Sequence, residues 1–335
     1  MSATGGFTLG LVLPAFLVLL VMLAAEDAVV SAPYPPLPEG YGLAARYPED
    51  AGIEEDPAVV FADGFEGFED DAIFTEAPQQ KGMKWDEAWH TVRITREPAN
   101  VHGGKQAVEI RHEKPMTSQG TGKVFAEGFE RLYVRYYMKF HKEFPGCHHV
   151  GMSIWAGAPG VVMRSGTATS ATGVRPNGEN HFVAVLDAAM PRRRSSDRPP
   201  GRSHIYCYHM DQVGNYGDHF FPSGRARPQQ NAGLFGEDFV PRPDFTAELD
   251  RWHCYELMVK ANTPGERDGR VAFWVDGVLR GDFPNLRLRS VDTLKANNIH
   301  LSSYSSRIRP NQTLWYDDVV VATSYIGPQV QPDPE

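Results

Sequence analysis

The sequence has few cysteines and lacks the motifs of several large enzyme classes. Its 335 residues include three cysteines, Cys147, Cys207 and Cys254, which cannot all pair within one chain. One disulfide with a free thiol and three free thiols are both compatible with this count. No CxxC or Cys/His zinc spacing occurs, and GxSxG, P-loop and dinucleotide-binding motifs are absent. The sequence therefore argues against a structural zinc site and against nucleotide-dependent chemistry.

Helical periodicity and net positive charge are also lacking. The formal net charge is -9, which argues against nucleic acid or an anionic membrane surface as the main partner. Glycine (32) and proline (26) are abundant and favour turns over long helices. Hydrophobic residues make up 41% of the chain, enough for a full core. These features predict a globular chain built from strands and turns.

The N-terminus carries a long apolar segment. Phe7 to Ala25 is uncharged, and Glu26 and Asp27 end it. This pattern predicts a secretory signal peptide over residues 1–25, with an uncleaved N-terminal membrane anchor as the alternative. Either interpretation predicts a secreted or extracytoplasmic protein. Residues 26–57 are rich in proline and acidic residues, and we interpret them as a linker or a strap across the domain surface.

The main domain is expected over residues 58–326, followed by a tail over 327–335. Runs such as "RLYVRYYMKF", "HHVGMSIW", "SHIYCYHM" and "WHCYELMVKA" read as strands separated by Gly, Pro and Asn loops. Many antiparallel strands in one long domain predict an all-β sandwich or jelly roll with long loops. Oligomeric state is left open by the sequence.

Alternation along four strands assigns each residue to the core or to an open face. The expected core residues are Leu132, Val134, Tyr136, Met138, Phe140, Ile205, Cys207, Val271, Phe273 and Val275. The opposite faces carry aromatic and cationic side chains, namely Arg111, Tyr133, Arg135, Tyr137, Lys139, Tyr206, Tyr208 and Trp274. If the four strands share one sheet, these groups form a surface whose rings stack on sugars and whose cations pair carboxylates. Such a surface would bind an anionic polysaccharide. A solvated face with Lys and Arg over the rings is the alternative.

Several patterns together resemble a known family. The run "WHCYELMVKANTPGERDGRVAFWVDGVLRGDF", the closing "LWYDDVVVATSYIGP" and "YCYH" before a Tyr-Gly resemble concanavalin A-like jelly rolls. They are most similar to polysaccharide lyase families 14 and 20 and their uncharacterised relatives. The resemblance implies a jelly-roll β-sandwich and cleavage of a uronic-acid polysaccharide by β-elimination.

The resemblance also implies roles for individual residues. Tyr206 and Tyr208 match the tyrosine pair of the family's cleft and would serve as base and acid, if neighbouring cations lower the pKa of a tyrosine. One of His148 and His149, which follow a Pro-Gly where the lyases carry a lysine loop, would help to hold the carboxylate. His181 would replace an arginine that the lyases carry on the next cleft strand.

Metal and cofactor expectations are limited. No cofactor is required, but Asp63, Glu66, Asp317 and Asp318 could gather around a structural calcium if the first and last strands lie together. Carboxylates in edge-strand turns are the alternative interpretation. His204, His209 and His219 are close in sequence, but their spacing matches no known metal site.

Three functions remain open from the sequence. The first is a lyase acting on a uronic-acid polysaccharide. The second is a non-catalytic carbohydrate-binding module with the same face, and the third, less favoured, is a cell-surface interaction domain. A glycosidase with paired carboxylates ranks below the lyase.

Overall fold

The structure is a computed structural model that describes residues 1–2, 34–69, 73–74, 82–90, 92–115, 117–158, 171–189, 197–228 and 233–331. The predicted signal peptide or anchor over 1–25 lies outside the described residues, apart from the first two. Within the described ranges, no helix is both long enough and apolar enough to cross a bilayer. Contacts divide the chain into residues 1–35 and a large unit over 36–335.

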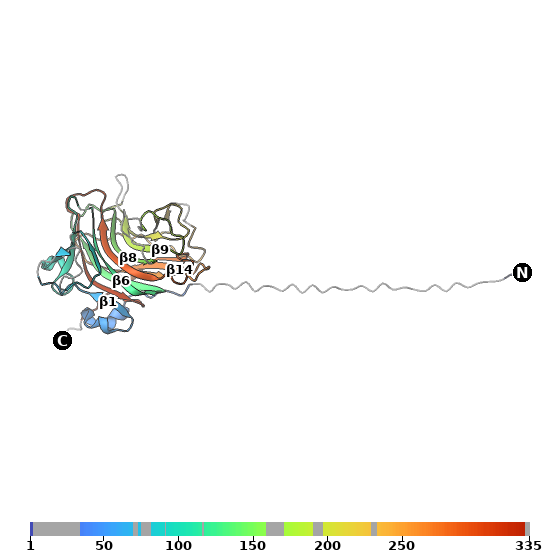
Figure 1. Cartoon of the computed structure of the whole chain (residues 1–335), viewed down its shortest axis with the longest axis horizontal. Coiled ribbons are helices and arrows are strands. Elements are labelled where there is room, and N and C mark those ends of the chain that lie inside the picture. The colour runs from blue at the N-terminus through green and yellow to red at the C-terminus, as the bar shows by residue number, and fades with distance from the viewer. Residues whose placement is uncertain are drawn as a thin grey trace. The chain divides into compact units, whose positions relative to one another are not determined.

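The large unit is built from strands, as predicted, and Figure 1 shows them curving across the domain. Its helical parts in the described residues are the short 3-10 turns η1 (Leu43–Arg46), η2 (Pro48–Asp50), η3 (Ile53–Glu55) and η4 (Pro98–Asn100). The strands are β1 (Val59–Asp63), β2 (Ile73–Phe74), β3 (Glu87–Trp89), β4 (Val92–Thr95), β5 (Ala107–Arg111), β6 (Ser118–Phe129), β7 (Arg131–Phe140), β8 (His149–Gly157), β9 (His181–Ala189), β10 (Arg202–Tyr208), β11 (Asp218–Phe220), β12 (Ala226–Arg227), β13 (His253–Lys260), β14 (Gly269–Val275), β15 (Val278–Leu286), β16 (Ala296–Tyr304) and β17 (Thr313–Ala322).

Two antiparallel sheets form the sandwich. Sheet A has the order β15-β14-β13-β7-β17-β5-β4-β2, with β1 also paired to β17. Sheet B has the order β12-β11-β10-β9-β8-β16-β6-β3. Neighbours in these orders are often far apart in sequence, as in a jelly roll, and the predicted all-β fold is confirmed.

The core lies between the two sheets and follows the predicted alternation. The residues expected to face inward on β7, β10 and β14 all join one buried cluster, which includes Leu132, Phe140, Ile205, Cys207 and Phe273. Burying one large apolar side chain contributes about 1.5–3 kcal/mol, so this cluster is a major source of stability. The three cysteines are buried and free.

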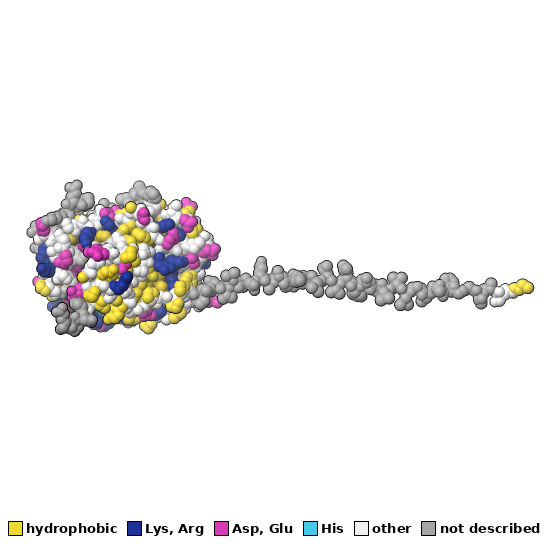
Figure 2. Space-filling model, turned by 90° about the horizontal axis from the view of Figure 1, so that it is seen from below, with side chains coloured by type: hydrophobic (Ala, Val, Ile, Leu, Met, Phe, Trp, Pro, Cys, Tyr) yellow, Lys and Arg dark blue, Asp and Glu magenta, His cyan; other side chains and the backbone are white. Residues whose placement is uncertain are grey.

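Segments from both ends of the large unit cover the outer face of sheet A. Backbone N–H groups of Leu43 and Ala44 donate to the carbonyls of Tyr325 and Ile326, at 3.1 and 2.9 Å. Figure 1 shows the blue segment that contains η1–η3 packed beside β1. We call residues 36–57 the strap. The molecule seen from below in Figure 2 shows Lys and Arg in small groups among acidic and hydrophobic side chains.

A charged network lies beneath the strap. Arg135 on β7 is fully buried and pairs with Asp50 of η2. Glu256 on β13 is also buried and accepts the backbone N–H groups of Ile326 and Gly327, both at 2.8 Å. These contacts fix the strap and the segment after β17 on the sheet.

The sheet order overturns one expectation. Strands β5, β7 and β14 belong to sheet A, whereas β10 belongs to sheet B, so their outward residues cannot form one shared face. Alternation correctly predicts which side chains of each strand face the core, but it does not specify which sheet a strand joins. The predicted single aromatic and cationic surface is therefore wrong.

Candidate functional site

A row of aromatic rings crosses the outer face of sheet B. Its members come from β16, β8, β10 and β11 and from the segments that flank β8 and β11, and we call them the ring row: Tyr304, His148, His149, Tyr206, His219, His204 and Phe221. Ring centroids are 4.5 Å apart for His148 and His149 and 4.8 Å for His149 and Tyr206. Tyr206 is 4.8 Å from His219 on its other side, so it lies between two imidazoles. Because these rings stack on one another, the row presents mainly ring edges and their polar atoms to a sugar chain.

The two tyrosines of β10 differ in accessibility. Both point to the outer face, as alternation predicted, and the hydroxyl of Tyr206 donates to that of Tyr208 at 3.3 Å. Tyr208 is buried, and its hydroxyl accepts the backbone N–H of Gly173 at 3.3 Å. Tyr206 is only half-buried and accepts the N–H of Gly217 at 3.2 Å. Tyr206 is therefore the one of the pair that a ligand could reach.

A buried carboxylate holds His149. The Oδ2 atom of Asp187 on β9 accepts a hydrogen bond from Nδ1 of His149 at 2.6 Å. Its Oδ1 atom accepts the backbone N–H groups of Val150 and Ala188 at 2.9 and 2.8 Å. Burial opposes ionisation of Asp187, but the His149 interactions and these N–H groups outweigh it and lower the pKa of the carboxyl.

This arrangement fixes the tautomer of His149. A carboxylate oxygen only accepts, so Nδ1 of His149 carries the proton and Nε2 of the neutral ring carries a lone pair. The side chain of His149 is 28% exposed. The Asp187–His149 pair is therefore arranged to accept a proton at the open face.

The electrostatics of Tyr206 differ from the expectation. Burial and the neighbouring Tyr208 raise the pKa of Tyr206 well above its ordinary value. Among the described residues, no Lys or Arg contacts either tyrosine ring or hydroxyl. The prediction that cations lower the pKa of Tyr206 is wrong, because the cations it relied on lie in sheet A. Tyr206 keeps its proton at neutral pH, so it can give a proton to a leaving group but cannot act as the base.

A second aromatic group lies further along the same face. Trp155 on β8 donates its Nε1 proton to Nε2 of His300 at 3.2 Å, and Trp89 on β3 meets the His300 ring edge-on at 5.3 Å. Glycines on β6 leave room for these rings, since a Cβ on Gly120 would lie 2.5 Å from Trp89 and one on Gly122 would lie 2.8 Å from His300. Trp89 is half-buried, so its ring extends the stacking surface.

The structure separates the predicted site residues into two groups. Tyr206, Tyr208, His148, His149 and His181 all belong to the outer side of sheet B. His148 is exposed and His149 half-exposed, but His181 is fully buried, with its ring 5.8 Å from that of Tyr208. Burial lowers the pKa of His181 to about 4, so it is a neutral packing group rather than a partner for a carboxylate.

The remaining predicted binding residues belong to sheet A. Trp274 donates its Nε1 proton to the carbonyl of Pro38 in the strap at 2.7 Å, and its ring lies 6.2 Å from Tyr133. The hydroxyl of Tyr137 accepts the N–H of Gln329 at 2.9 Å.

The cations of sheet A are paired in the same way. Lys139 is buried and donates to the carbonyl of Ala99. Arg111 is partly exposed but pairs with Glu109 at 2.8 Å. The assignment of these sheet A residues to a carbohydrate cleft is therefore wrong, because other parts of the chain satisfy or cover them.

The proposed calcium ligands are engaged by the protein itself. Asp63 accepts the Nε1 proton of Trp85 at 2.9 Å, and Glu66 accepts the N–H of Lys105 at 2.7 Å. Asp317 accepts the N–H of His102 at 2.8 Å, and Asp318 pairs with Nδ1 of His102 at 2.7 Å. Within the described ranges, no three acidic, His or Cys side chains lie close enough to hold a metal. Structural calcium stays a prediction.

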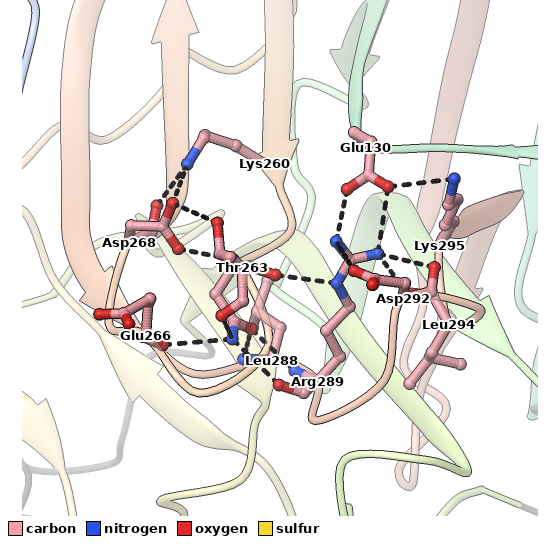
Figure 3. Close-up of polar contacts among 11 residues, drawn as sticks. Glu130, Lys260, Thr263, Glu266, Asp268, Leu288, Arg289, Asp292, Leu294 and Lys295 are labelled. Atoms are coloured by element: carbon pink, nitrogen blue, oxygen red, sulfur yellow. Dashed lines mark hydrogen bonds and ion pairs between the residues drawn. The ribbon is translucent and has the colours of Figure 1, made fainter.

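A cavity of about 400 Å³ lies elsewhere, at the end of β13. Its charged walls pair with each other, as Figure 3 shows. Arg289 bonds Glu130 at 2.6 Å, and Lys260 bonds Asp268 at 2.9 Å. Arg289 and Lys260 thus already have acidic partners, and the cavity is a weaker candidate than the ring row.

Sequence reasoning missed Asp187 and the pairing of His204 with His219. Asp187 follows His181, Val183 and Val185 at alternate positions of one strand, so these four side chains share a face. A single carboxylate beside valines on that face is the sequence signal that could have identified Asp187. The sequence shows His204 and His219 to be near each other along the chain, but it does not indicate that their rings are in contact. Their contact depends on the pairing of β10 with β11, which places Tyr206 opposite His219. His209 points away from them and pairs with buried Asp218 at 2.9 Å.

Comparisons with known proteins extend the description of the fold. No protein-family model matches the sequence, and no curated protein matches it. The chain is similar to the solved structure of a mutant of alginate lyase Aly36B in complex with alginate trisaccharide, with 16% identity and a TM-score of 0.53, over 80% of this chain and 99% of that chain. It is also similar to the marine PL-14 alginate lyase from Aplysia kurodai, with 14% identity and a TM-score of 0.54, over 79% of this chain and 99% of that chain. The chain therefore has the jelly-roll fold seen in alginate lyases, and the resemblance in fold to polysaccharide lyases is confirmed.

Proposed function

We propose that the outer face of sheet B binds a polysaccharide made of uronic acids and cleaves it by β-elimination. The observation that carries the proposal is the Asp187–His149 pair, whose imidazole ring stacks on the ring of Tyr206 with centroids 4.8 Å apart. An acceptor and a donor held side by side are the two groups that this reaction needs. The likeness in fold to alginate lyases supports the same class of ligand.

The proposed step assigns one proton transfer to each group. Nε2 of His149 takes the proton from C5 of the uronic acid, and the electrons of that C–H bond form the C4=C5 double bond. The bond between C4 and the glycosidic oxygen breaks, and Tyr206 donates its phenolic proton to the leaving oxygen. The products are a chain with a new hydroxyl and a chain that ends in an unsaturated uronate. The proton on His149 returns to Tyr206 through solvent.

His148 and Tyr208 take supporting roles in this proposal. His148 stacks on His149 and belongs to the same open edge, where it can donate to the sugar or its carboxylate. Tyr208 is buried and accepts from Tyr206, so it orients the phenol rather than touching substrate. Arg225, at the other end of the ring row, lies over Phe221 with 55% of its side chain exposed, but it already pairs with Asp244 at 2.8 Å.

A second candidate function is a non-catalytic sugar-binding module. The absence of a Lys or Arg beside the tyrosines, among the described residues, favours it, since a lyase must steady the charge that develops on the carboxylate. The ring row would bind the same polysaccharide in either case. The apolar N-terminal segment supports action outside the cytoplasm in both.

One panel of assays separates these functions. Purified protein is incubated with alginate, glucuronan and pectate, and ultraviolet absorbance of the unsaturated uronate is followed, with binding measured by calorimetry. We expect cleavage of at least one polymer and a loss of about 10²–10⁴-fold in kcat for Tyr206→Phe and for His149→Gln. Tyr41→Phe, which changes an exposed tyrosine of the strap, and His141→Gln, just after β7, are matched controls that should keep full activity. Saturable binding without cleavage supports the module, and neither binding nor cleavage refutes both.

A further inference from the structure

His204 and His219 form a hydrogen-bonded pair of imidazoles beside Tyr206. Nε2 of His204 and Nδ1 of His219 are 2.7 Å apart. His204 is a buried member of the ring row, whereas His219 is half-buried and reaches the open face. Nδ1 of His204 is 3.3 Å from the carbonyl oxygen of Arg202.

These contacts determine where the protons of both rings lie. A carbonyl oxygen only accepts, so Nδ1 of His204 carries the proton that reaches Arg202. Nε2 of neutral His204 then holds a lone pair and must accept from Nδ1–H of His219. Consequently, Nε2 of His219 is bare. The opposite arrangement, in which Nε2–H of His204 donates to His219, would leave the lone pair on Nδ1 of His204 facing the carbonyl oxygen of Arg202.

The surroundings keep both rings neutral. Burial and the neighbouring His204 lower the pKa of His219 to about 3, and burial lowers that of His204. Among the described residues, no group pairs with Nε2 of His219. Its ring lies 4.8 Å from that of Tyr206, the proposed acid. A bare acceptor is thus presented directly beside the reacting position.

We propose that Nε2 of His219 is a specificity-determining acceptor that takes a free hydroxyl of the sugar ring bound beside Tyr206. The inference rests on the proposed function, because it assumes that a polysaccharide lies along the ring row. A hydroxyl can donate to the lone pair, whereas an O-acetyl group has no proton to give and leaves the acceptor unpaired. A carboxylate or sulfate at that position would be repelled by the lone pair on Nε2 of His219. The site therefore selects polymers whose hydroxyl at this position is not acetylated.

The first test compares two forms of one polymer. Affinity and KM are measured for polyglucuronate before and after chemical O-acetylation. We expect the wild type to prefer the unacetylated form by about tenfold, the effect of one hydrogen bond at a partly exposed site. His219→Asn keeps an amide donor toward His204 but removes the acceptor, and His219→Phe keeps the ring packing on Tyr206. Both variants should raise KM for the unacetylated polymer and reduce the preference between the two forms to about onefold. His219→Gln can place a carbonyl oxygen near the Nε2 position, so it should restore part of the preference.

The second test reads the tautomer directly. Long-range ¹⁵N–¹H NMR of the wild type at neutral pH should show Nδ1 of His219 protonated and Nε2 bare. A protonated Nε2, or equal affinity of the wild type for the two polymers, overturns the inference while leaving the lyase or binding function intact. Failure of the wild type to bind or cleave any polyuronate overturns the proposed function and this inference with it. His141→Phe, just after β7, is the control substitution, and it should keep the tenfold preference.

Discussion

Replacing Asp187 by asparagine should disable His149 without unfolding the protein. The Oδ1 atom of Asp187 accepts two backbone N–H groups, from Val150 and Ala188, and neither can turn into an acceptor. The carbonyl oxygen of an asparagine must therefore take the Oδ1 position, which places its NH₂ group at the Oδ2 position facing His149. Nδ1 of His149 would then have to accept, so the ring proton moves to Nε2 and blocks the atom proposed to take the C5 proton.

The magnitude follows from the loss of general-base catalysis. Such catalysis contributes about 10²–10⁴-fold, so we expect kcat to fall by that factor, equivalent to about 3–5 kcal/mol in the activation barrier. An Asp→Asn change that traps the wrong histidine tautomer costs about 10⁴-fold in Ser-His-Asp enzymes. Binding should change little, because the ring row stays in place.

The chain contains a matched control for this substitution. Asp276 holds Nδ1 of His253 at 2.7 Å and the N–H of Cys254 at 2.9 Å, the same pattern as Asp187 but on sheet A. Asp276→Asn should leave kcat unchanged. The assay is initial-rate ultraviolet absorbance, with NMR of the imidazole nitrogens and thermal melting as checks. If Asp187→Asn keeps kcat within about threefold while His149 shows a protonated Nε2, the assignment of His149 as the base is refuted.

Three further outcomes test the packing that supports the site. Asp50→Ala should destabilise the protein by about 3–5 kcal/mol in urea unfolding, because it leaves the fully buried charge of Arg135 without its partner, and a loss below about 1 kcal/mol would contradict the buried ion pair. Burial raises the pKa of Glu256 to about 7 in the folded state, so its contribution to stability is complete below its unfolded pKa of about 4.3 and is lost as pH rises through 7. Glu256→Gln should flatten the pH dependence of the melting temperature in that window, and an unchanged profile would show that Glu256 does not titrate there. Gly217→Ala would place a Cβ 2.7 Å from the carbonyl of Cys207, so we expect a displaced Tyr206 and a lower kcat, with wild-type kcat counting against the role of the Gly217 N–H.

The sequence predicted what depends on neighbouring residues in a strand. Period-two alternation identified the inward side chains of β7, β10 and β14, because the side-chain direction is a local property. The family resemblance in fold was also recovered. The pair Tyr206 and Tyr208 was correctly placed on the outer side of its strand.

What the sequence could not predict depends on contacts between distant segments. The face of β7 that carries Arg135 and Tyr137 looks like a binding surface when the strand is read alone. It is closed by Asp50 and Gln329, which lie 85 residues before Arg135 and 192 residues after Tyr137. Likewise, Asp187 becomes part of a site only because β9 lies beside β8 and brings the carboxylate to His149.

The closure of sheet A by segments from both ends of the large unit has a consequence for biosynthesis. Gly42 and Ile326 lie so close that a Cβ on Gly42 would be 2.7 Å from the carbonyl oxygen of Ile326. Glu256 obtains its two N–H donors only when residues 326 and 327 have left the ribosome. The nascent chain must therefore keep an incompletely sealed sandwich until residues 326 and 327 are translated, and a stop codon shortly before that point would release a protein whose interior carboxylate lacks these two donors.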